Sequence, residues 1–282
     1  MRPSSLSVIG LGAIGGSLAW QARLAGVPRV VGFSPSRADA VQALRSSAVT
    51  ELADSAIKAA RGAELVVLAV PARATLDLIG RLRPSLEPGA VLTDVCSVKG
   101  PVLARAMEEG MGDRFAGGHP LAGTHGSGFS AARPDRLKGC VVYVCETGAP
   151  GGDQVGRRIM RFWAEVLEAQ PVLIDAAAHD RQLAWTSHLP QVMASVLART
   201  LAERGLAGVS FGTGARDTTR LAASSPEMWV DILRYNRAAL ADALAATGAS
   251  LAELCRLLEA DDADGLRDFL AAAQRFREGL DR

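Results

Sequence analysis

A glycine-rich turn near the N-terminus constrains the fold more than any other feature of this sequence. It follows a short apolar run and precedes residues 14–24, whose apolar side chains recur at helical spacing. In this strand–turn–helix context, glycines permit a tight turn, close approach of a pyrophosphate to the backbone, and close packing of helix on strand. The helix N-terminus offers N–H donors to phosphates. We therefore predict a dinucleotide site at Gly10, Gly12, Ala13, Ile14 and Gly15; a glycine-rich turn without a ligand is the alternative.

Short apolar runs alternate with helical stretches over the first part of the chain. The predicted strands are residues 7–11, 29–33, 65–70, 91–95, 115–118 and 141–145. This alternation predicts a parallel, doubly wound α/β sheet of the Rossmann type, and the continuous apolar character of residues 65–70 fits a strand covered on both faces. Val70 and Pro71, where that run ends, are further candidates for contact with the cofactor.

The sequence changes in character after Val172-Leu173-Ile174. Ala, Leu and Arg then dominate, and the predicted helices are residues 177–203, 227–246, 251–259 and 264–279. Ser225-Pro226-Glu227 is a favourable helix start, with a capping Ser, Pro in the first position and an acid in the first turn. We therefore predict a Rossmann domain over residues 1–175 and an all-α domain over residues 176–282, which closes the substrate side of the cleft and forms a homodimer.

Composition excludes several classes of protein. The net charge is only +1, which argues against a nucleic-acid partner and favours a small-molecule substrate. The N-terminal apolar run is too short for a signal peptide, and we find no stretch of about 20 apolar residues, so no membrane partner is expected. The four cysteines have neither CxxC nor His/Cys metal spacing. They indicate free thiols, a cytoplasmic protein and no metal site.

The end of the second predicted strand bears on the choice of cofactor. NAD-specific sites usually carry Asp or Glu there, to bind the ribose 2′-hydroxyl. This chain has Ser34 at that position and Arg37 shortly after it. A hydroxyl tolerates a 2′-phosphate and a guanidinium can pair with it. The cofactor is thus NADP or NAD, with NADP accepted, unless Ser34 merely caps a turn and Arg37 is a solvated helix residue.

Candidate catalytic residues follow two other predicted strands. His119 lies where a strand enters a glycine-rich loop, at the carboxyl edge that binds ligands in open α/β sheets. A neutral imidazole can accept the proton of an alcohol near pH 7. Ser97 can bind the substrate hydroxyl or orient His119, and Lys99, one of only three lysines, can neutralise a carboxylate or orient a loop. The alternatives are a structural His119, a helix-capping Ser97 and a surface Lys99.

Two further residues are candidates for the substrate pocket. His188 precedes Leu189-Pro190 inside a predicted helix, and a proline there kinks the helix and frees a carbonyl. Polar residues beside such a kink often line a pocket, although a buried structural histidine would fit too. Arg220 precedes the helix start at Ser225 and can bind a carboxylate in bidentate fashion, although a surface role is the default for an arginine in this Arg-rich chain.

Together these segments resemble the prephenate dehydrogenase family, which includes arogenate and cyclohexadienyl dehydrogenases. The resemblance runs in order through nearly the whole chain. The glycine motif is shared with many dehydrogenases, whereas the segments around His119 and His188 are more specific. The matching text is residues 8–17, Asp94 to Lys99, Gly117-Gly118-His119-Pro120-Leu121-Ala122-Gly123, Ser187-His188-Leu189-Pro190, and Asp217 through Arg220 to Trp229.

The resemblance implies an oxidoreductase of tyrosine biosynthesis. The family oxidises the ring C4 alcohol of prephenate, or of its amino analogue arogenate, transferring hydride to NAD(P) while the ring carboxylate leaves as CO2. By this analogy prephenate yields 4-hydroxyphenylpyruvate. His119 polarises the C4 hydroxyl with help from Ser97, His188 lines the pocket, and Arg220 binds a substrate carboxylate. A helical dimerisation domain follows the sheet in the family.

One departure bears on the substrate. After Gly123-Thr124 many relatives carry an acid, whereas this chain has His125. An acid can hold the ammonium of arogenate and a histidine does so poorly, so we expect Thr124 and His125 to line a pocket that favours prephenate. The alternative is a His125 that faces water.

Two other classes of protein remain as alternatives. A 3-hydroxyacid or 6-phosphogluconate type dehydrogenase has the same layout but relies on a lysine in its helical domain, and residues 176–282 contain none. A non-catalytic nucleotide sensor would not need His119, Ser97 and Arg220 together.

Overall fold

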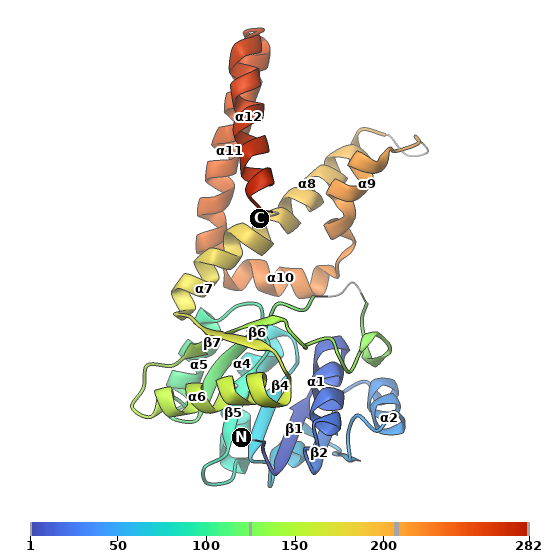
Figure 1. The fold of residues 1–282 in the computed structure, drawn as a ribbon, viewed down its shortest axis with the longest axis vertical. Coiled ribbons are helices and arrows are strands. Elements are labelled where there is room, and N and C mark those ends of the chain that lie inside the picture. The colour runs from blue at the N-terminus through green and yellow to red at the C-terminus, as the bar shows by residue number, and fades with distance from the viewer. Residues whose placement is uncertain (1, 124–125, 206–208, 281–282) are drawn as a thin grey trace.

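The computed structural model describes residues 2–123, 126–205 and 209–280. Figure 1 shows an α/β unit carrying both the N-terminus and the sheet, with a set of helices extending from one end of it. This is the α/β domain followed by a helical domain that the sequence predicts.

One eight-stranded sheet forms the centre of the α/β unit, in the order β3-β2-β1-β4-β5-β6-β7-β8. Neighbours from β3 to β6 pair in parallel. The two-residue β3 is too short to have been recognised from periodicity. The strands are β1 (Ser5–Ile9), β2 (Arg29–Phe33), β3 (Glu51–Leu52), β4 (Leu65–Leu68), β5 (Val91–Asp94), β6 (Phe115–Pro120), β7 (Val141–Glu146) and β8 (Gln170–Leu173).

The prediction of a wholly parallel sheet is wrong for its last two strands. β7 runs antiparallel to β6, with His119 opposite Tyr143, and β8 then pairs in parallel with β7. A parallel pair needs a crossover connection over one face of the sheet. Here the chain leaves β6 and returns directly beside it as β7, without crossing a face of the sheet. The hydrogen bond of 2.8 Å from the Leu121 N–H to the Val141 carbonyl joins the two ends of this connection.

Helices cover both faces of the sheet, as expected for a doubly wound fold. One buried apolar cluster includes Leu18 of α1 and Ile159 of α6, and the other includes Ile79 of α4 and Val102 of α5. The helices are α1 (Ala13–Leu24), α2 (Arg37–Arg45), α3 (Ala56–Ala60), α4 (Ala72–Leu82), α5 (Gly100–Glu108) and α6 (Gly152–Arg161), with a π-helical segment, η3 (Phe162–Val166), and 3₁₀ turns η1 (Arg83–Ser85) and η2 (Phe129–Ala131).

The predicted helix start at Ser225 is confirmed, because the Ser225 hydroxyl accepts a hydrogen bond from the Met228 N–H at 3.4 Å. The predicted kink near Pro190 takes the form of a π-helical segment just before it, and Pro190 lies in the first turn of the next helix, where its missing N–H is tolerated. The elements are α7 (Ala176–Leu183), η4 (Ala184–His188), α8 (Leu189–Glu203), α9 (Thr213–Thr219), the 3₁₀ turn η5 (Arg220–Ala223), α10 (Pro226–Tyr235), α11 (Arg237–Glu259) and α12 (Ala263–Gly279). We keep residue 175, in the short connection between β8 and α7, as our proposed domain boundary.

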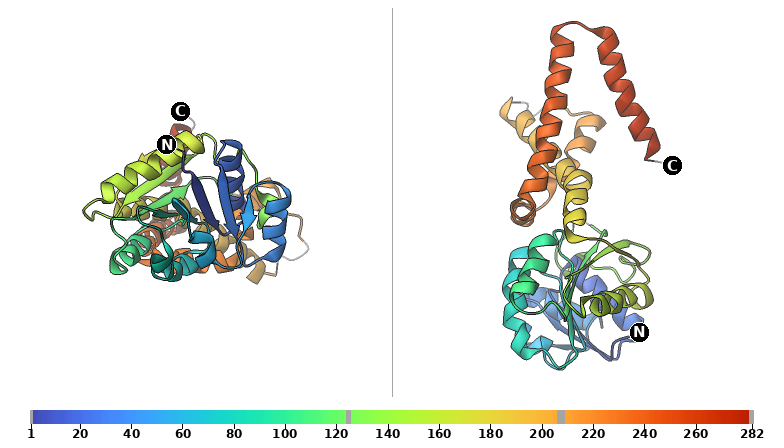
Figure 2. Two further views of the ribbon diagram at one scale, coloured as in Figure 1. Left: turned by 90° about the horizontal axis from the view of Figure 1, so that it is seen from below. Right: turned by 90° about the vertical axis from the view of Figure 1, so that its left-hand side faces the viewer.

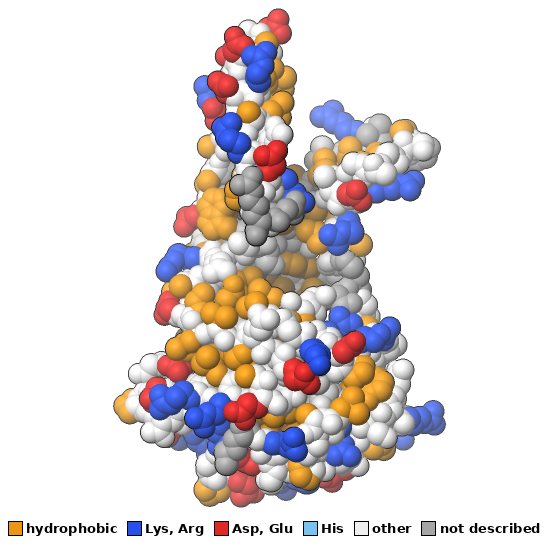
Figure 3. All heavy atoms as spheres, in the orientation of Figure 1, with side chains coloured by type: hydrophobic (Ala, Val, Ile, Leu, Met, Phe, Trp, Pro, Cys, Tyr) orange, Lys and Arg blue, Asp and Glu red, His pale blue; other side chains and the backbone are white. Residues whose placement is uncertain are grey.

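The α11–α12 hairpin projects away from the sheet (Figure 2), and Figure 3 shows hydrophobic side chains on its surface. Leu258 is 60% exposed and Phe276 is 70% exposed. We expected no segment with the length and apolar character of a membrane span, and α11 corrects this, because its 23 residues meet both criteria. Only 11% of its most apolar stretch is buried. This hairpin therefore presents an apolar surface that the single chain leaves uncovered.

The glycine turn after β1 allows a test of which glycines the fold itself requires. A Cβ on Gly15 would lie 1.9 Å from the Gly10 carbonyl oxygen, whereas a Cβ on Gly12 would meet nothing within 4 Å. We expect Gly15→Ala to lower the free energy of unfolding by about 1–3 kcal/mol through steric strain. The extended backbone of Gly12 suits alanine, so Gly12→Ala should stay within about 1 kcal/mol of the wild type. Urea unfolding of the apoprotein measures both, and equal losses would contradict the assignment.

Candidate active site

The candidate residues gather where the parallel strands end. The glycine turn follows β1, Val70 and Pro71 follow β4, Ser97 follows β5, and His119 lies near the end of β6. Because these strands are parallel neighbours, their carboxyl ends meet at one edge of the sheet, the usual position of a ligand site in such folds. The helical domain packs at the same edge, since α7 contacts both α5 and β7.

The glycine turn has the form of a phosphate cradle. Gly10 adopts a φ of +101°, and a Cβ there would lie 2.2 Å from the Ala69 carbonyl oxygen, so the tight turn requires glycine. Helix α1 starts with Ala13 and Ile14, and no side chain caps its N-terminus. The open space over Gly12 leaves the backbone free for close approach. Uncapped amides beside an open backbone suit a pyrophosphate.

The end of β2, directly before Ser34, lies next to this turn, since the Gly10 N–H donates to the Phe33 carbonyl at 2.8 Å. The Ser34 hydroxyl accepts a hydrogen bond from the Ser36 N–H at 3.2 Å, so Ser34 caps the turn before α2, as the alternative expects, and Ser36 caps α2 itself. Arg37 is the first residue of α2 and is exposed. The position at which NAD-specific sites carry an acid therefore holds a hydroxyl, with an exposed guanidinium beside it.

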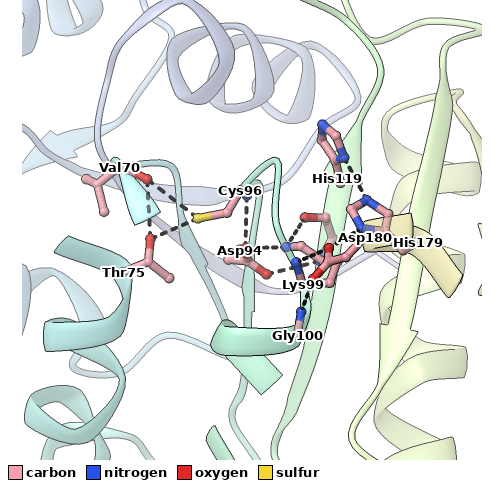
Figure 4. A network of polar contacts seen from close by, with 10 residues as sticks. Val70, Thr75, Asp94, Cys96, Lys99, Gly100, His119, His179 and Asp180 are labelled. Atoms are coloured by element: carbon pink, nitrogen blue, oxygen red, sulfur yellow. Dashed lines mark hydrogen bonds and ion pairs between the residues drawn. The ribbon is translucent and has the colours of Figure 1, made fainter. Parts of the chain in front are cut away.

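His119 is buried, with only 7% of its surface exposed, and its partner comes from the helical domain. Its Nδ1 lies 2.9 Å from Nε2 of His179, and Nδ1 of His179 lies 2.8 Å from Oδ1 of Asp180 (Figure 4). Burial, followed by the nearness of the basic groups of His179, Lys99 and His188, holds the pKa of His119 well below its usual range. His119 is therefore a neutral imidazole at pH 7.

Asp180 joins the helical domain to the sheet domain. Its carboxylate accepts hydrogen bonds from the backbone N–H groups of Lys99 and Gly100, both at 2.8 Å, at the start of α5. Burial raises the pKa of Asp180, but the hydrogen bonds from His179 and from these two amides outweigh it and lower the pKa overall. An ionised carboxylate at the N-terminus of α5 also suits the helix dipole.

Lys99 has a different place from the one expected for a substrate-binding residue. Its side chain is fully buried, its ammonium forms an ion pair with Asp94, and it donates to the Gly118 carbonyl at 2.7 Å. Asp94 accepts the Gly118 N–H at 3.1 Å. Both the prediction of contact with a substrate carboxylate and the alternative of a surface lysine are wrong, because the charge is compensated inside the protein. The pair holds the backbone next to His119.

Ser97 is half-buried at the same edge of the sheet. We expected that Ser97 could orient His119, but the residue that contacts Nδ1 of His119 is His179. Ser97 therefore does not orient the ring through Nδ1. The alternative that Ser97 caps the next helix is wrong, because α5 begins at Gly100 and receives the carboxylate of Asp180. A direct contact between Ser97 and substrate stays a prediction.

His188 ends the π-helical segment η4 and is completely buried. Its Nδ1 accepts from the Asn236 side-chain amide at 3.1 Å, and the same amide donates to the Asp180 carbonyl at 2.7 Å. Burial lowers the pKa of His188 to about 4, so the ring is neutral and its proton resides on Nε2. The ring of Trp229 lies edge-on to that of His188. Within the described residues, neither the Nε2–H of His188 nor the indole N–H of Trp229 has a hydrogen-bond acceptor, although both are buried.

The remaining predicted residues lie further along the chain. Arg220 begins the 3₁₀ turn η5 and is exposed, and Gln191 of α8 anchors this turn by donating to the Leu221 carbonyl at 2.9 Å. Thr124 and His125 lie outside the described residues. Sequence reasoning assigned no role to His179, Asp180, Asn236 or Trp229. The adjacency of His179 and Asp180 just after the predicted boundary, in a chain with four histidines, was the available signal.

Comparison with known proteins gives a consistent result over both parts of the chain. Residues 18–170 match the family model described as prephenate dehydrogenase, nucleotide-binding domain, and residues 175–272 match prephenate dehydrogenase, dimerization domain. Prephenate dehydrogenase of Bacillus subtilis is 30% identical, over 98% of this chain and 76% of that protein. Cyclohexadienyl dehydrogenase of Zymomonas mobilis is 32% identical, over 98% of this chain and 95% of that protein.

A solved structure agrees with the whole fold. The crystal structure of prephenate dehydrogenase from A. aeolicus, in complex with hydroxyphenyl propionate and NAD+, has a TM-score of 0.88 at 26% identity, covering 98% of each chain. The matched family models, the relatives and the fold together lead to one conclusion: the chain belongs to the prephenate dehydrogenase family of NAD(P)-dependent oxidoreductases, which includes arogenate and cyclohexadienyl dehydrogenases.

Proposed function

We propose that this enzyme catalyses the oxidative decarboxylation of prephenate to 4-hydroxyphenylpyruvate with NADP or NAD, in tyrosine biosynthesis. The observation that carries the proposal is a buried, neutral His119 at the carboxyl edge of the sheet, held through Nδ1 by the helical domain. Among the described residues, its other nitrogen, Nε2, has no hydrogen-bond partner, and we assign it to the substrate. A neutral imidazole in such a cleft suits acceptance of an alcohol proton.

The reaction requires a proton acceptor for the C4 hydroxyl and a group that binds a substrate carboxylate. When bound, the nicotinamide supplies the hydride acceptor for C4 of the ring. His119 accepts the proton of the C4 hydroxyl as hydride leaves C4, the ring carboxylate departs as CO2, and its bonding electrons complete the aromatic ring. The phenolate oxygen then takes a proton back from His119, which gives 4-hydroxyphenylpyruvate and regenerates the base. The exposed guanidinium of Arg220 is assigned to a substrate carboxylate, which it can bind in bidentate fashion. The unpartnered N–H groups of His188 and Trp229 are suited to donate to the substrate's oxygens.

The glycine turn is assigned to the cofactor's pyrophosphate, with Ala13 and Ile14 supplying amides, and Val70 and Pro71 are assigned to the same side of the cleft. Ser34 and Arg37 are assigned to the ribose 2′-substituent, which leads us to propose that NADP is accepted.

We further propose a cytoplasmic homodimer. The exposed apolar residues of the α11–α12 hairpin and a match to a dimerisation domain support the dimer. The free Cys96, Cys140, Cys145 and Cys255 fit a reducing compartment.

The role of His119 can be tested by His119→Asn, which keeps a polar side chain but removes the base. We expect kcat with prephenate to fall by about 10²–10⁴-fold, the range for loss of a positioned proton acceptor. Nicotinamide absorbance in the steady state gives kcat. The Kd for NADP, from fluorescence titration, should stay unchanged and serves as the control. A loss of kcat below about tenfold would remove His119 as the base.

The choice of cofactor can be tested with arginine variants on one helix. Arg37→Ala removes the proposed partner of the 2′-phosphate, and we expect kcat/KM with NADP to fall by about 10-fold or more while that with NAD changes little. Arg45→Ala is the matched control, because it removes an equally exposed arginine at the far end of α2. A wild-type enzyme with a large NAD preference, or equal effects of both variants, would contradict NADP recognition here.

The choice between prephenate and arogenate depends on position 125. Because His125 replaces an acid that can hold an ammonium group, we expect kcat/KM for prephenate to exceed that for arogenate by about tenfold or more, a difference of about 1.4 kcal/mol. His125→Glu should narrow this ratio. Steady-state kinetics with both substrates and both cofactors measures it. Comparable activity of the wild type on arogenate would favour the second candidate function, an arogenate dehydrogenase that forms tyrosine directly.

A further inference from the structure

We propose that His179 and Asp180 are positioning residues that fix the tautomer of His119, so that its Nε2 carries the lone pair offered to the substrate. This inference rests on the proposed role of His119 as proton acceptor. It assigns a function to two adjacent residues of α7 that do not contact the reacting atoms. The contacts come from three segments that are far apart in the sequence (Figure 4).

The argument starts at the carboxylate, whose partners are fixed. Asp180 accepts from two backbone amides, which can only donate, and an ionised carboxylate is itself only an acceptor. The contact of 2.8 Å between Asp180 Oδ1 and His179 Nδ1 therefore requires a proton on that nitrogen. In a neutral His179, Nε2 is then an acceptor, so His119 Nδ1 must donate across the 2.9 Å contact. A neutral His119 has one ring proton, and its Nε2 is bare.

A charged His179 would reverse the second hydrogen bond. It would donate from Nε2, and His119 would then carry its proton on Nε2, the nitrogen that must accept one from the alcohol. Two observations favour the neutral form. His179 is completely buried and His119 is nearly so, and burying an additional cation costs free energy. Lys99, a buried cation close by, has its charge compensated by Asp94, and a charged His179 would place a second positive charge near it.

The same arrangement supports the reaction step. When the alcohol O–H bond breaks and a proton joins Nε2 of His119, the resulting imidazolium still donates from Nδ1 to His179. His179 donates in turn to the carboxylate of Asp180, so the new positive charge is linked through one neutral ring to a negative one. No proton needs to reach Asp180, whose hydrogen bonds favour its ionised form. The pair therefore orients the base and stabilises its charged form.

Histidine nitrogen NMR reads the tautomer directly, and the chain has four histidines. In the full-length wild type labelled with ¹⁵N-histidine, we expect a protonated Nδ1 and a bare Nε2 for His119, whose signals are identified by their loss in His119→Asn. In His179→Leu the acceptor is gone, so His119 should shift towards a proton on Nε2. With that shift, kcat should fall by about 10²–10⁴-fold while KM changes by less than about threefold.

Two further variants separate this role from a structural one. His179→Gln can present a carbonyl oxygen to His119 Nδ1, so it should retain the wild-type tautomer and recover at least about tenfold of the kcat lost in His179→Leu. Tyr143→Phe is the matched control, because the ring of Tyr143 packs edge-on against His179 while its hydroxyl is bonded to Gln182 instead. It should leave both the tautomer and kcat unchanged.

Two results would overturn the inference: a wild-type His119 with its proton on Nε2, or a His179→Leu protein that keeps either the wild-type tautomer or the wild-type kcat. If His179→Leu does not fold, the wild-type spectrum and His179→Gln still decide. An active His119→Asn enzyme would instead refute the proposed base, and the spectra would still report on the hydrogen-bond direction.

Discussion

The carboxylate of Asp180 is the constraint on which the geometry of the site depends. A buried charge is costly unless hydrogen bonds compensate it, and Asp180 obtains them from the start of α5 and from His179. Two of these donors belong to the start of α5 in the sheet domain, whereas Asp180 belongs to α7, so satisfying the charge sets the position of α7 against the sheet. The backbone carbonyl of the same residue accepts from Asn236, which ties the junction of α10 and α11 to this point.

A second buried charge acts on the sheet side of the site. The ion pair between Asp94 and Lys99 binds both the N–H and the carbonyl of Gly118, the residue before His119. Buried ion pairs contribute little net stability on average, because desolvation offsets the Coulomb attraction. Their value here is positional. One buried charge fixes the backbone of His119 and the other fixes its ring, so the base is constrained from two sides.

The sequence predicts local features of this enzyme better than relations between distant segments. Strand positions follow from apolar runs, the glycine turn from its spacing, and the start of α10 from Ser225 and Pro226, because each depends on neighbours along the chain. The direction of β7 does not, since it depends on where the preceding connection returns. The burial of Lys99 and the contact between His119 and His179, 60 residues apart, likewise depend on the tertiary fold. Without the family resemblance, an exposed Arg220 would have remained an ordinary surface arginine.

The two buried histidines of the site illustrate how one residue type acquires opposite roles. Both rings are kept neutral by burial. His188 receives a hydrogen bond on Nδ1 from Nδ2 of Asn236, the nitrogen that also donates to the Asp180 carbonyl, so its own Nε2 carries a proton and is suited to donate to a substrate oxygen. His119 gives a hydrogen bond from Nδ1 to His179 in our assignment, so its Nε2 is suited to accept one. Asn236 donates to the backbone carbonyl of Asp180, and His179 contacts its carboxylate. One residue therefore positions the partner of His188, the donor, and the partner of His119, the acceptor. Which of the two rings donates and which accepts through Nε2 therefore depends on the group that faces its Nδ1. Both of these groups, Asn236 and His179, are held at the junction between the two domains.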